Sequence, residues 1–307
     1  ARTASCDGIR LQGKNISVGQ IDSRLVRSAY EEDTTGAYFK AQDAVIGSIY
    51  IENAGGHEAG CVFKGARRTN GNNARGFSIS VGSLKLFAND GDDRCAVYLA
   101  PDDVHIGFLS VEGYGGDVVD NDGNLRSGSG PLVFCESTDK SRLHIDRYSI
   151  VNCQLGQALS DSGSGQVEVF SLRGYREIKI GPGFVDNVSN DKWPTRSPDM
   201  SVFRWSGGQS TTVTSIEIGS AHVRGMDAGT GSAEVTLFNL DSNKRLDHFT
   251  AWNPIIDNSV DHGLVAKSSS DIGRIQVIGG DLTACSPNEL DLNGTTPATS
   301  FIGCNGL

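Results

Sequence analysis

The chain lacks most features of a helical or membrane protein. Its 307 residues include only 8 prolines and 2 methionines, and no long stretch spaces apolar residues as an amphipathic helix does. No apolar run reaches the roughly 18 residues of a membrane-spanning helix, so no membrane insertion is expected. Lys and Arg number 27 against 37 Asp and Glu, a formal net charge of −10. We therefore expect no nucleic-acid partner, because phosphate binding needs a basic surface.

Motifs for cofactors and metals are also missing. The sequence has no G-x-G-x-x-G or G-K-[ST] motif for nucleotides, and no histidine pair has the H-x-x-x-H spacing of zinc ligands. We therefore predict no cofactor and no metal site. Calcium remains an alternative in two acidic loops, at 117–124 and 89–93, because both are rich in carboxylate and amide oxygens.

The seven cysteines do not form the pattern of a small disulfide-linked domain. Their number is odd, and most of them lie within apolar strand-like runs. We expect buried free thiols that pack as small apolar side chains. A Cys61–Cys95 disulfide is the alternative, because the two residues open similar segments, GCVF and RCAVY, on adjacent repeats.

What the chain does have is a repeated phrase with glycine at its fourth position. Clear copies are ISVGQI (16–21), AVIGSI (44–49), ISVGSL (79–84), VHIGFL (104–109) and IEIGSA (216–221). Degenerate copies are LHIDRY (143–148), IKIGPG (178–183), FTAWNP (249–254) and VIGGDL (277–282). The recurrence of roughly 25 to 40 residues indicates a repeat protein. Apolar residues alternate within each phrase, which predicts strands.

A second family of short strands precedes the glycine phrase. Its members are AYFKAQD (37–43), GCVFKGA (60–66), AVYLAPD (96–102), LVFCEST (132–138), QALSDSG (157–163), SVFRWSG (201–207), EVTLFNL (234–240), GLVAKSS (263–269) and ELDLNGT (289–295). Two or three strands in a unit of about 30 residues predict an all-β fold, a right-handed parallel β-helix of about nine coils. We expect one domain over 1–307, a piece of a longer chain.

The paired phrases carry a resemblance. CAVYLAPDDVHIGFLSVEGYGG (95–116) and AVIGSIYIENAGG (44–56) are similar to coils of the pectate-lyase-like right-handed β-helix superfamily, and their style resembles the bodies of phage tailspikes. No catalytic signature of a family within it is reproduced. The resemblance implies an extended carbohydrate groove along one face and, as in tailspikes, a homotrimer.

Stacking of coils predicts a column of polar residues at the ends of the second strand family. The column comprises Lys40, Lys64, Ala100, Glu136, Asp161, Arg204 with Trp205, Asn239, Lys267 and Asn293. Glycoside hydrolysis needs two carboxylates about 5 to 9.5 Å apart, and one or two rungs supply that separation. Glu136 and Asp161 are therefore the predicted acid–base pair.

Other residues are assigned to binding the sugar. Arg204 would bind an acidic sugar and Trp205 would stack on a ring, with Lys267 and Asn239 as polar contacts. Trp193, in the long insertion expected at 184–200, would form the wall of the groove or an intersubunit contact. Elimination by a lyase is the alternative chemistry, with Lys64, Arg67 and Arg68, or Lys267 and His262, as basic groups. Asp102 and Asp139 are reserve carboxylates.

The last feature of the sequence is a pair of histidines. His105 and His144 hold the polar position of equivalent phrases, V-H-I and L-H-I, and are expected to form an outward ladder on adjacent coils.

Together these features predict a depolymerase that binds and cleaves a surface polysaccharide, a capsule or O-antigen for example, by hydrolysis rather than elimination. A glycan-binding adhesin and a structural fibre segment are the alternatives. The expected location is the virion surface of a phage tail or the extracellular space, with a secreted bacterial protein as the alternative.

Overall fold

The fold is taken from a computed structural model of the chain. It describes residues 7–24, 35–52, 55–56, 59–63, 78–87, 90–91, 95–115, 131–136, 142–155, 166–190, 199–206, 212–229, 231–242, 244–266, 271–284, 290–291, 298–303 and 305. These residues form strands and no helix, so none of them belongs to a helix that could cross a membrane.

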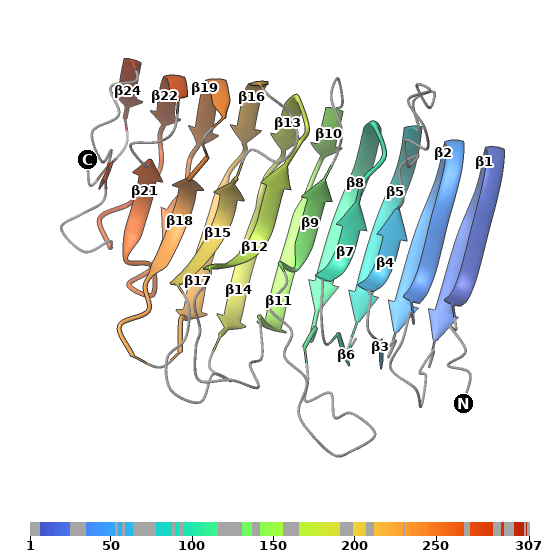
Figure 1. The fold of residues 1–307 in the computed structure, drawn as a ribbon. Coiled ribbons are helices and arrows are strands. Elements are labelled where there is room, and N and C mark those ends of the chain that lie inside the picture. The colour runs from blue at the N-terminus through green and yellow to red at the C-terminus, as the bar shows by residue number, and fades with distance from the viewer. Residues whose placement is uncertain are drawn as a thin grey trace.

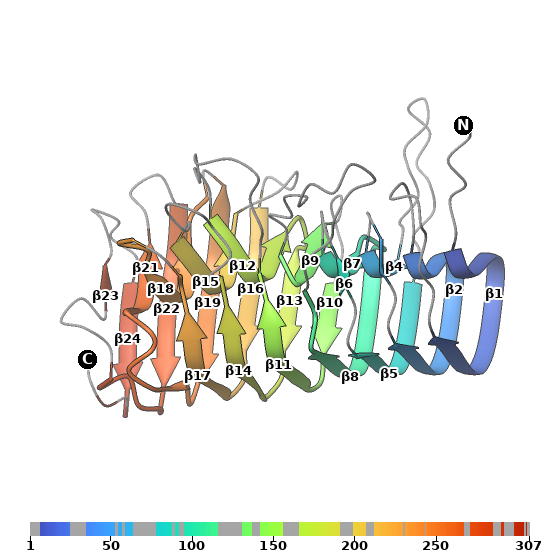
Figure 2. The same cartoon turned by 90° about the horizontal axis from the view of Figure 1, so that it is seen from below.

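The protein is a right-handed parallel β-helix with three faces, and every inter-strand pairing in the described residues is parallel (Figures 1 and 2). The first face contains β1 (Asp7–Arg24), β2 (Thr35–Glu52), β4 (Ala59–Phe63), β7 (Cys95–Leu99), β9 (Val133–Glu136), β12 (Gln166–Arg173), β15 (Asp199–Trp205), β18 (Val235–Leu240), β21 (His262–Ala266) and β23 (Leu290–Asp291).

The second face continues β1 and β2 and adds β5 (Ser78–Phe87), β8 (Asp103–Glu112), β10 (Arg142–Ile145), β13 (Glu177–Ile180), β16 (Thr212–Ile218), β19 (Arg245–Trp252), β22 (Asp271–Ile278) and β24 (Ala298–Ile302). The third face holds the later halves of β1, β2, β5 and β8, followed by β11 (Tyr148–Gln154), β14 (Gly183–Ser189), β17 (Ala221–Asp227) and β20 (Ile255–Ile256). A separate pair joins β3 (Gly55–Gly56) to β6 (Asp90–Gly91).

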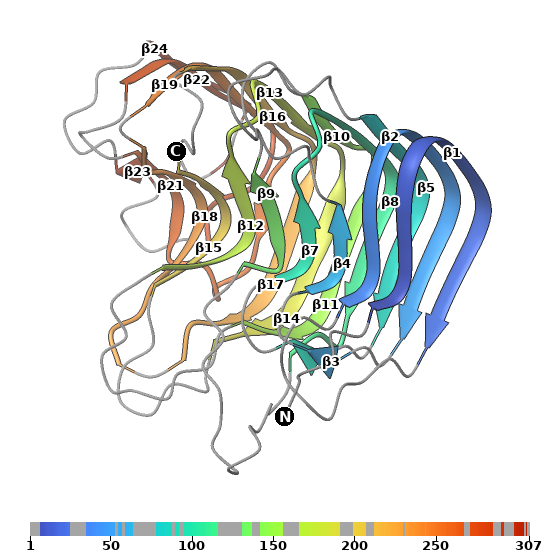
Figure 3. The same cartoon turned by 45° about the vertical axis from the view of Figure 1, so that its right-hand side comes forward.

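The glycine phrase turns the corner between the second and third faces. In β5 the buried residues are Ile79 and Val81 before Gly82, and Leu84 and Leu86 after it. The spacing across the glycine is three residues instead of two, so both halves of a bent strand face the interior. β1 and β2 curve through the same corner without a break (Figure 3). From β10 onward the corner interrupts the strand, and two shorter strands replace one.

Glycine is required at this corner because successive rungs meet there backbone to backbone. A Cβ atom added at Gly47 would lie 2.3 Å from the carbonyl oxygen of Gly19, and one at Gly82 would lie 2.4 Å from that of Gly47. At Gly107 the distance to the Gly82 oxygen would be 2.6 Å. The repeated glycine therefore permits rungs to stack at the normal strand spacing.

The interior is filled by ladders of apolar side chains. Phe170, Phe203 and Phe238 occupy one register position on β12, β15 and β18, and their ring centroids are 5.0 and 5.7 Å apart. All three rings are buried, and Tyr148 packs edge-on against the first of them. Each rung thus covers the apolar surface of the next, which stabilises the array rung by rung.

The structure confirms the predicted fold class and adds detail to the coil assignment. Ten rungs can be followed on the first face from β1 to β23, one more than the sequence copies suggested, because β1 also supplies a first-face strand. In the sixth rung this face is formed by β12, whereas the segment 157–163, which the sequence favoured, lies outside the described residues. The long insertion expected at 184–200 is also shorter, because β14 extends to Ser189.

The expectation for the cysteines is settled for Cys61, Cys95, Cys135 and Cys153, which are all buried free thiols. Cys61 pairs in register with Val97 and Cys95 with Ala59, so the two residues are not equivalent and the alternative disulfide is wrong. Burial raises the pKa of Cys153 to about 12, which keeps it protonated at neutral pH. Cys6, Cys285 and Cys304 lie outside the described residues.

Candidate functional site

The first face places the predicted acid–base pair differently from the sequence alignment. Glu136, the last residue of β9, pairs in register with Arg173 of β12. The residue one rung from Glu136 is therefore an arginine and not Asp161, and the pairing of these two carboxylates by rung is wrong. The physical reason is that β12 begins after residue 165, so the alignment assigned the wrong segment to this rung. Asp161 itself and the side chain of Glu136 lie outside the described residues.

Trp205 is not available to a sugar. Its side chain is 1 % exposed and shares the register position of Leu172 and Leu240, both of which are buried. The indole therefore fills the core, and its expected role as a stacking platform is corrected. Trp252, in contrast, is 40 % exposed at the end of β19. Trp193 and Lys267 lie outside the described residues, as do the basic residues Lys64, Arg67 and Arg68 and the acidic loop 117–124.

Arg204 and Asn239 do share one column, as predicted. They are register partners on β15 and β18, and the same column continues back through Ser171 and Phe134 to Tyr98. Asn239 is buried, and its Nδ2 donates to Ser201 Oγ at 3.1 Å. Asn239 therefore links two rungs through a buried hydrogen bond and is not an exposed contact for a sugar.

Arg204 organises a group of charged residues that we call the first-face cluster: Glu168, Arg173, Arg204 and Asp241. Arg204 donates through Nη1 to Glu168 Oε1 at 2.5 Å and through Nη2 to Asp241 Oδ2 at 3.4 Å. Arg173 Nη2 lies 3.8 Å from the same Glu168 oxygen. The Glu168 side chain is only 3 % exposed. A carboxylate charge can stay buried only when cations pair with it, and Arg204 and Arg173 supply that pairing.

Several polar atoms of this region are buried without a hydrogen-bond partner in the described structure. They are Ser171 Oγ, Arg173 Nε, Arg204 Nε and Ser206 Oγ. Ser171 pairs with Arg204, and Arg173 and Ser206 each follow a member of the register pair Leu172–Trp205. The four atoms therefore belong to two rungs and to the two columns on either side of that pair. Buried polar groups are nearly always paired, with protein or with water. Water or other polar groups would complete the hydrogen bonding of these four atoms.

An aromatic surface borders the first-face cluster toward the N-terminus. The rings of Tyr98 and Phe134 lie on adjacent rungs with centroids 5.4 Å apart, and both are half-buried. The Arg173 guanidinium lies 5.2 Å from the centroid of Phe134. Aromatic rings beside arginines and carboxylates offer a sugar both an apolar surface and hydrogen-bonding groups.

The cluster also brings two carboxylates together. Because Glu168 and Asp241 bind the two terminal nitrogens of one guanidinium, their contacting oxygens are at most about 8 Å apart. That limit admits the carboxylate separations of both retaining and inverting glycosidases. Asp241 is the more accessible of the two, with a side chain 20 % exposed.

Sequence reasoning missed Glu168 and Asp241. Glu168 is a charged residue between two buried valines in the segment V-E-V, which was a usable signal, but its strand had not been assigned to a rung. Asp241 directly follows β18 and stands one position beyond Leu240, the partner of Trp205. A shift of the column by one or two residues separates the predicted site from the observed one.

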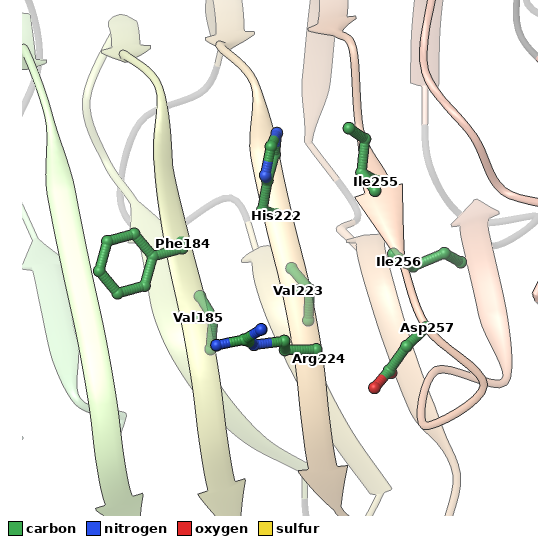
Figure 4. Close-up of a pocket in the computed structure, with 8 residues that line it drawn as sticks. All are labelled: Phe184, Val185, His222, Val223, Arg224, Ile255, Ile256 and Asp257. Atoms are coloured by element: carbon green, nitrogen blue, oxygen red, sulfur yellow. The ribbon is translucent and has the colours of Figure 1, made fainter.

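A hollow of about 490 Å³ lies on the third face (Figure 4). Phe184, His222 and Ile255 hold one register position on β14, β17 and β20 and form its outer surface. Phe184 is 46 % and Ile255 42 % exposed. Arg224 extends toward the strand of Val185 and donates to Asp186 Oδ2 at 2.7 Å. Most of the residues that line this hollow are apolar, so it offers a polar ligand fewer groups than the first-face cluster does.

Asp257, at the edge of this hollow, links rungs through its carboxylate. It accepts hydrogen bonds from the Gly225 and Ser259 amides, each at 3.0 Å, and from the Ser259 hydroxyl. Partial burial acts to raise the pKa of Asp257, but these hydrogen bonds outweigh it and hold the pKa below the usual value.

A pH-dependent contribution to stability follows from Asp257. Because its pKa is lower in the folded state, its contribution is complete above about pH 4 and is lost as the pH falls through the folded pKa. We expect Asp257→Asn to lower the free energy of unfolding at pH 7 by about 1 to 2 kcal/mol, and the difference from wild type to shrink at pH 3. Urea unfolding at both pH values measures this. An equal difference at both values would contradict the assignment.

Comparisons with known proteins add no relative. The sequence matches no family model, no curated protein and no solved structure.

Proposed function

We propose that the protein binds an anionic polysaccharide on its first face and cleaves it by hydrolysis. The observation that carries this proposal is the first-face cluster itself, where the partly exposed Arg173, Arg204 and Asp241 lie together beside an aromatic surface. Guanidinium nitrogens suit the carboxylate of a uronic acid or another acidic sugar substituent. A rigid face with ten equivalent rungs also suits a repeating polymer, because successive sugars can follow successive rungs.

The proposed roles follow from the contacts. Arg204 and Arg173 bind the acidic group, and the rings of Tyr98 and Phe134 border the site on one side. Glu168 is a positioning residue, because it is buried and acts through the two arginines. Asp241 is the proposed acid or base, since it is accessible and faces the Arg204 guanidinium.

Two variants separate binding from cleavage. Arg204→Lys keeps the positive charge but loses the paired geometry, so we expect about tenfold to hundredfold weaker binding of an anionic oligosaccharide. Asp241→Asn should retain binding and lose the release of new reducing ends from a panel of capsular and lipopolysaccharide glycans. Arg245→Lys, on the second face, is the matched control, because this arginine is exposed and lies away from the first-face cluster, and it should change neither property.

Three other outcomes of these experiments would each indicate a different class of protein. Cleavage that produces an unsaturated uronate, detected by its ultraviolet absorbance, would replace hydrolysis by elimination. Binding without cleavage in the wild type would support a glycan-binding adhesin. No binding to any anionic glycan would overturn the proposal and leave a structural fibre segment.

The proposed assembly is a homotrimer of the tailspike type, on the virion surface or outside the cell. The resemblance to tailspike bodies supports it, and the exposed Phe184 and Ile255 are compatible with a subunit contact. Light scattering on the purified protein should give three times the chain mass of 32.5 kDa. A monomer mass at micromolar concentration would contradict a trimer.

A further inference from the structure

Three metal-ligating side chains meet on the second face, away from the first-face cluster. His105 of β8 and His144 of β10 are register partners, and their ring centroids are 5.1 Å apart. Asp146 lies between them. Its Oδ2 is 3.0 Å from His105 Nε2, and its Oδ1 is 3.0 Å from His144 Nε2. The predicted histidine ladder is thus confirmed, and a carboxylate joins it.

Asp146 occupies a position that is glycine on the neighbouring rungs. Ile145 pairs with Ile106 and with Ile180, so Asp146 stands opposite Gly107 on one side and Gly181 on the other. The strand is interrupted there, since β10 ends at Ile145 and β11 begins at Tyr148. The exception to the repeat therefore places a carboxylate against the two imidazoles.

We propose that His105, His144 and Asp146 form a binding site for a divalent transition-metal ion of the zinc class. One ligand atom from each residue lies within 4.8 Å of the others. Around a tetrahedral zinc ion, ligand atoms are about 3.3 Å apart, so small side-chain rotations bring the three into place. Two imidazoles and one carboxylate suit zinc rather than calcium or magnesium, which prefer oxygen ligands alone.

The surroundings leave the site open. The side chains of His105, His144 and Asp146 are 49 %, 43 % and 43 % exposed, so an ion can enter and keep solvent ligands. A hollow of about 380 Å³ adjoins the histidines and is also lined by Ser80, Asp103 and Arg142. The nearby cations are paired with carboxylates, Arg142 with Asp103 at 3.1 Å and Lys179 with Glu217 at 3.9 Å.

Because the ligands come from two rungs, a bound ion would clamp β8 to β10. An ion that binds only the folded state raises the stability of that state. The site is therefore a structural clamp at the place where one bent strand is replaced by two.

Calorimetric titration of the purified, chelator-treated protein with Zn²⁺ tests the site. We expect one ion per chain, an increased Tm in the presence of Zn²⁺, and no binding of Mg²⁺ or Ca²⁺. His144→Ala and Asp146→Gly should each weaken Zn²⁺ binding by about tenfold or more. His248→Ala, an exposed histidine on β19 of the same face, is the matched control and should bind as the wild type does.

Asp146→Gly is the decisive variant, because it restores the residue that the neighbouring rungs carry and should fold normally. Absence of Zn²⁺ binding to the wild type would overturn the proposal. So would Zn²⁺ binding that survives in both His144→Ala and Asp146→Gly, since the ion would then be held elsewhere. In that case Asp146 would serve only to accept hydrogen bonds from the two imidazoles.

Discussion

Gly82→Ala should destabilise the protein by about 1 to 3 kcal/mol, the usual range for an overpacked interior. The added methyl group would meet the backbone oxygen of Gly47 at 2.4 Å, and no side-chain rotation can relieve a contact with backbone. The rungs on either side would have to separate, which weakens strand pairing at the corner. Urea unfolding of the two proteins measures the loss.

Gly19→Ala is a control from the same column. Gly19 lies in β1, the first described rung, and a Cβ atom there would have no heavy atom within 4 Å. Its expected effect is within about 0.5 kcal/mol. If Gly19→Ala and Gly82→Ala were equally destabilising, the repeated glycine would be needed for some reason other than the stacking of rungs.

Arg204→Met should lower the free energy of unfolding by about 3 to 5 kcal/mol, more than Gly82→Ala does, because it leaves the buried Glu168 carboxylate without its main partner. Arg173 remains, but 3.8 Å away. The double variant Glu168→Leu/Arg204→Met removes both charges, and we expect most of the lost stability to return. The comparison requires unfolding curves for both single variants and the double variant.

An exposed ion pair provides the matched control. Arg224 donates to Asp186, and the Arg224 side chain is 72 % exposed. Arg224→Met should therefore cost no more than about 1 kcal/mol. A loss at Arg204 as small as that at Arg224 would show that solvent reaches Glu168 and that the first-face cluster is not buried.

The fold could be predicted because its signals are local. A glycine recurs with apolar residues on both sides, and each copy is sufficient to indicate a strand at a corner. What the pattern did not show was the bend itself. The spacing of apolar residues changes from two to three at Gly82, and this change is visible in the sequence. It indicates a bend only once both halves of the strand are known to face the same interior.

The site could be predicted only in part, because a column depends on register. Placing the sixth rung twelve residues too early exchanged Arg173 for Asp161 and hid Glu168. Trp205 was misplaced by one residue, which in a strand reverses the direction of the side chain. His105 and His144 were found as a ladder, yet Asp146 was not connected to them, since it stands in a degenerate copy of the glycine phrase.

The most direct test of the proposed function is binding of an anionic oligosaccharide to the double variant Glu168→Leu/Arg204→Met. This protein should fold nearly as stably as the wild type, yet it lacks the guanidinium that holds the acidic sugar. The proposal predicts that a glycan bound by the wild type no longer binds to the variant, in a calorimetric titration at matched concentrations. Unchanged affinity would contradict it and place the glycan elsewhere on the β-helix.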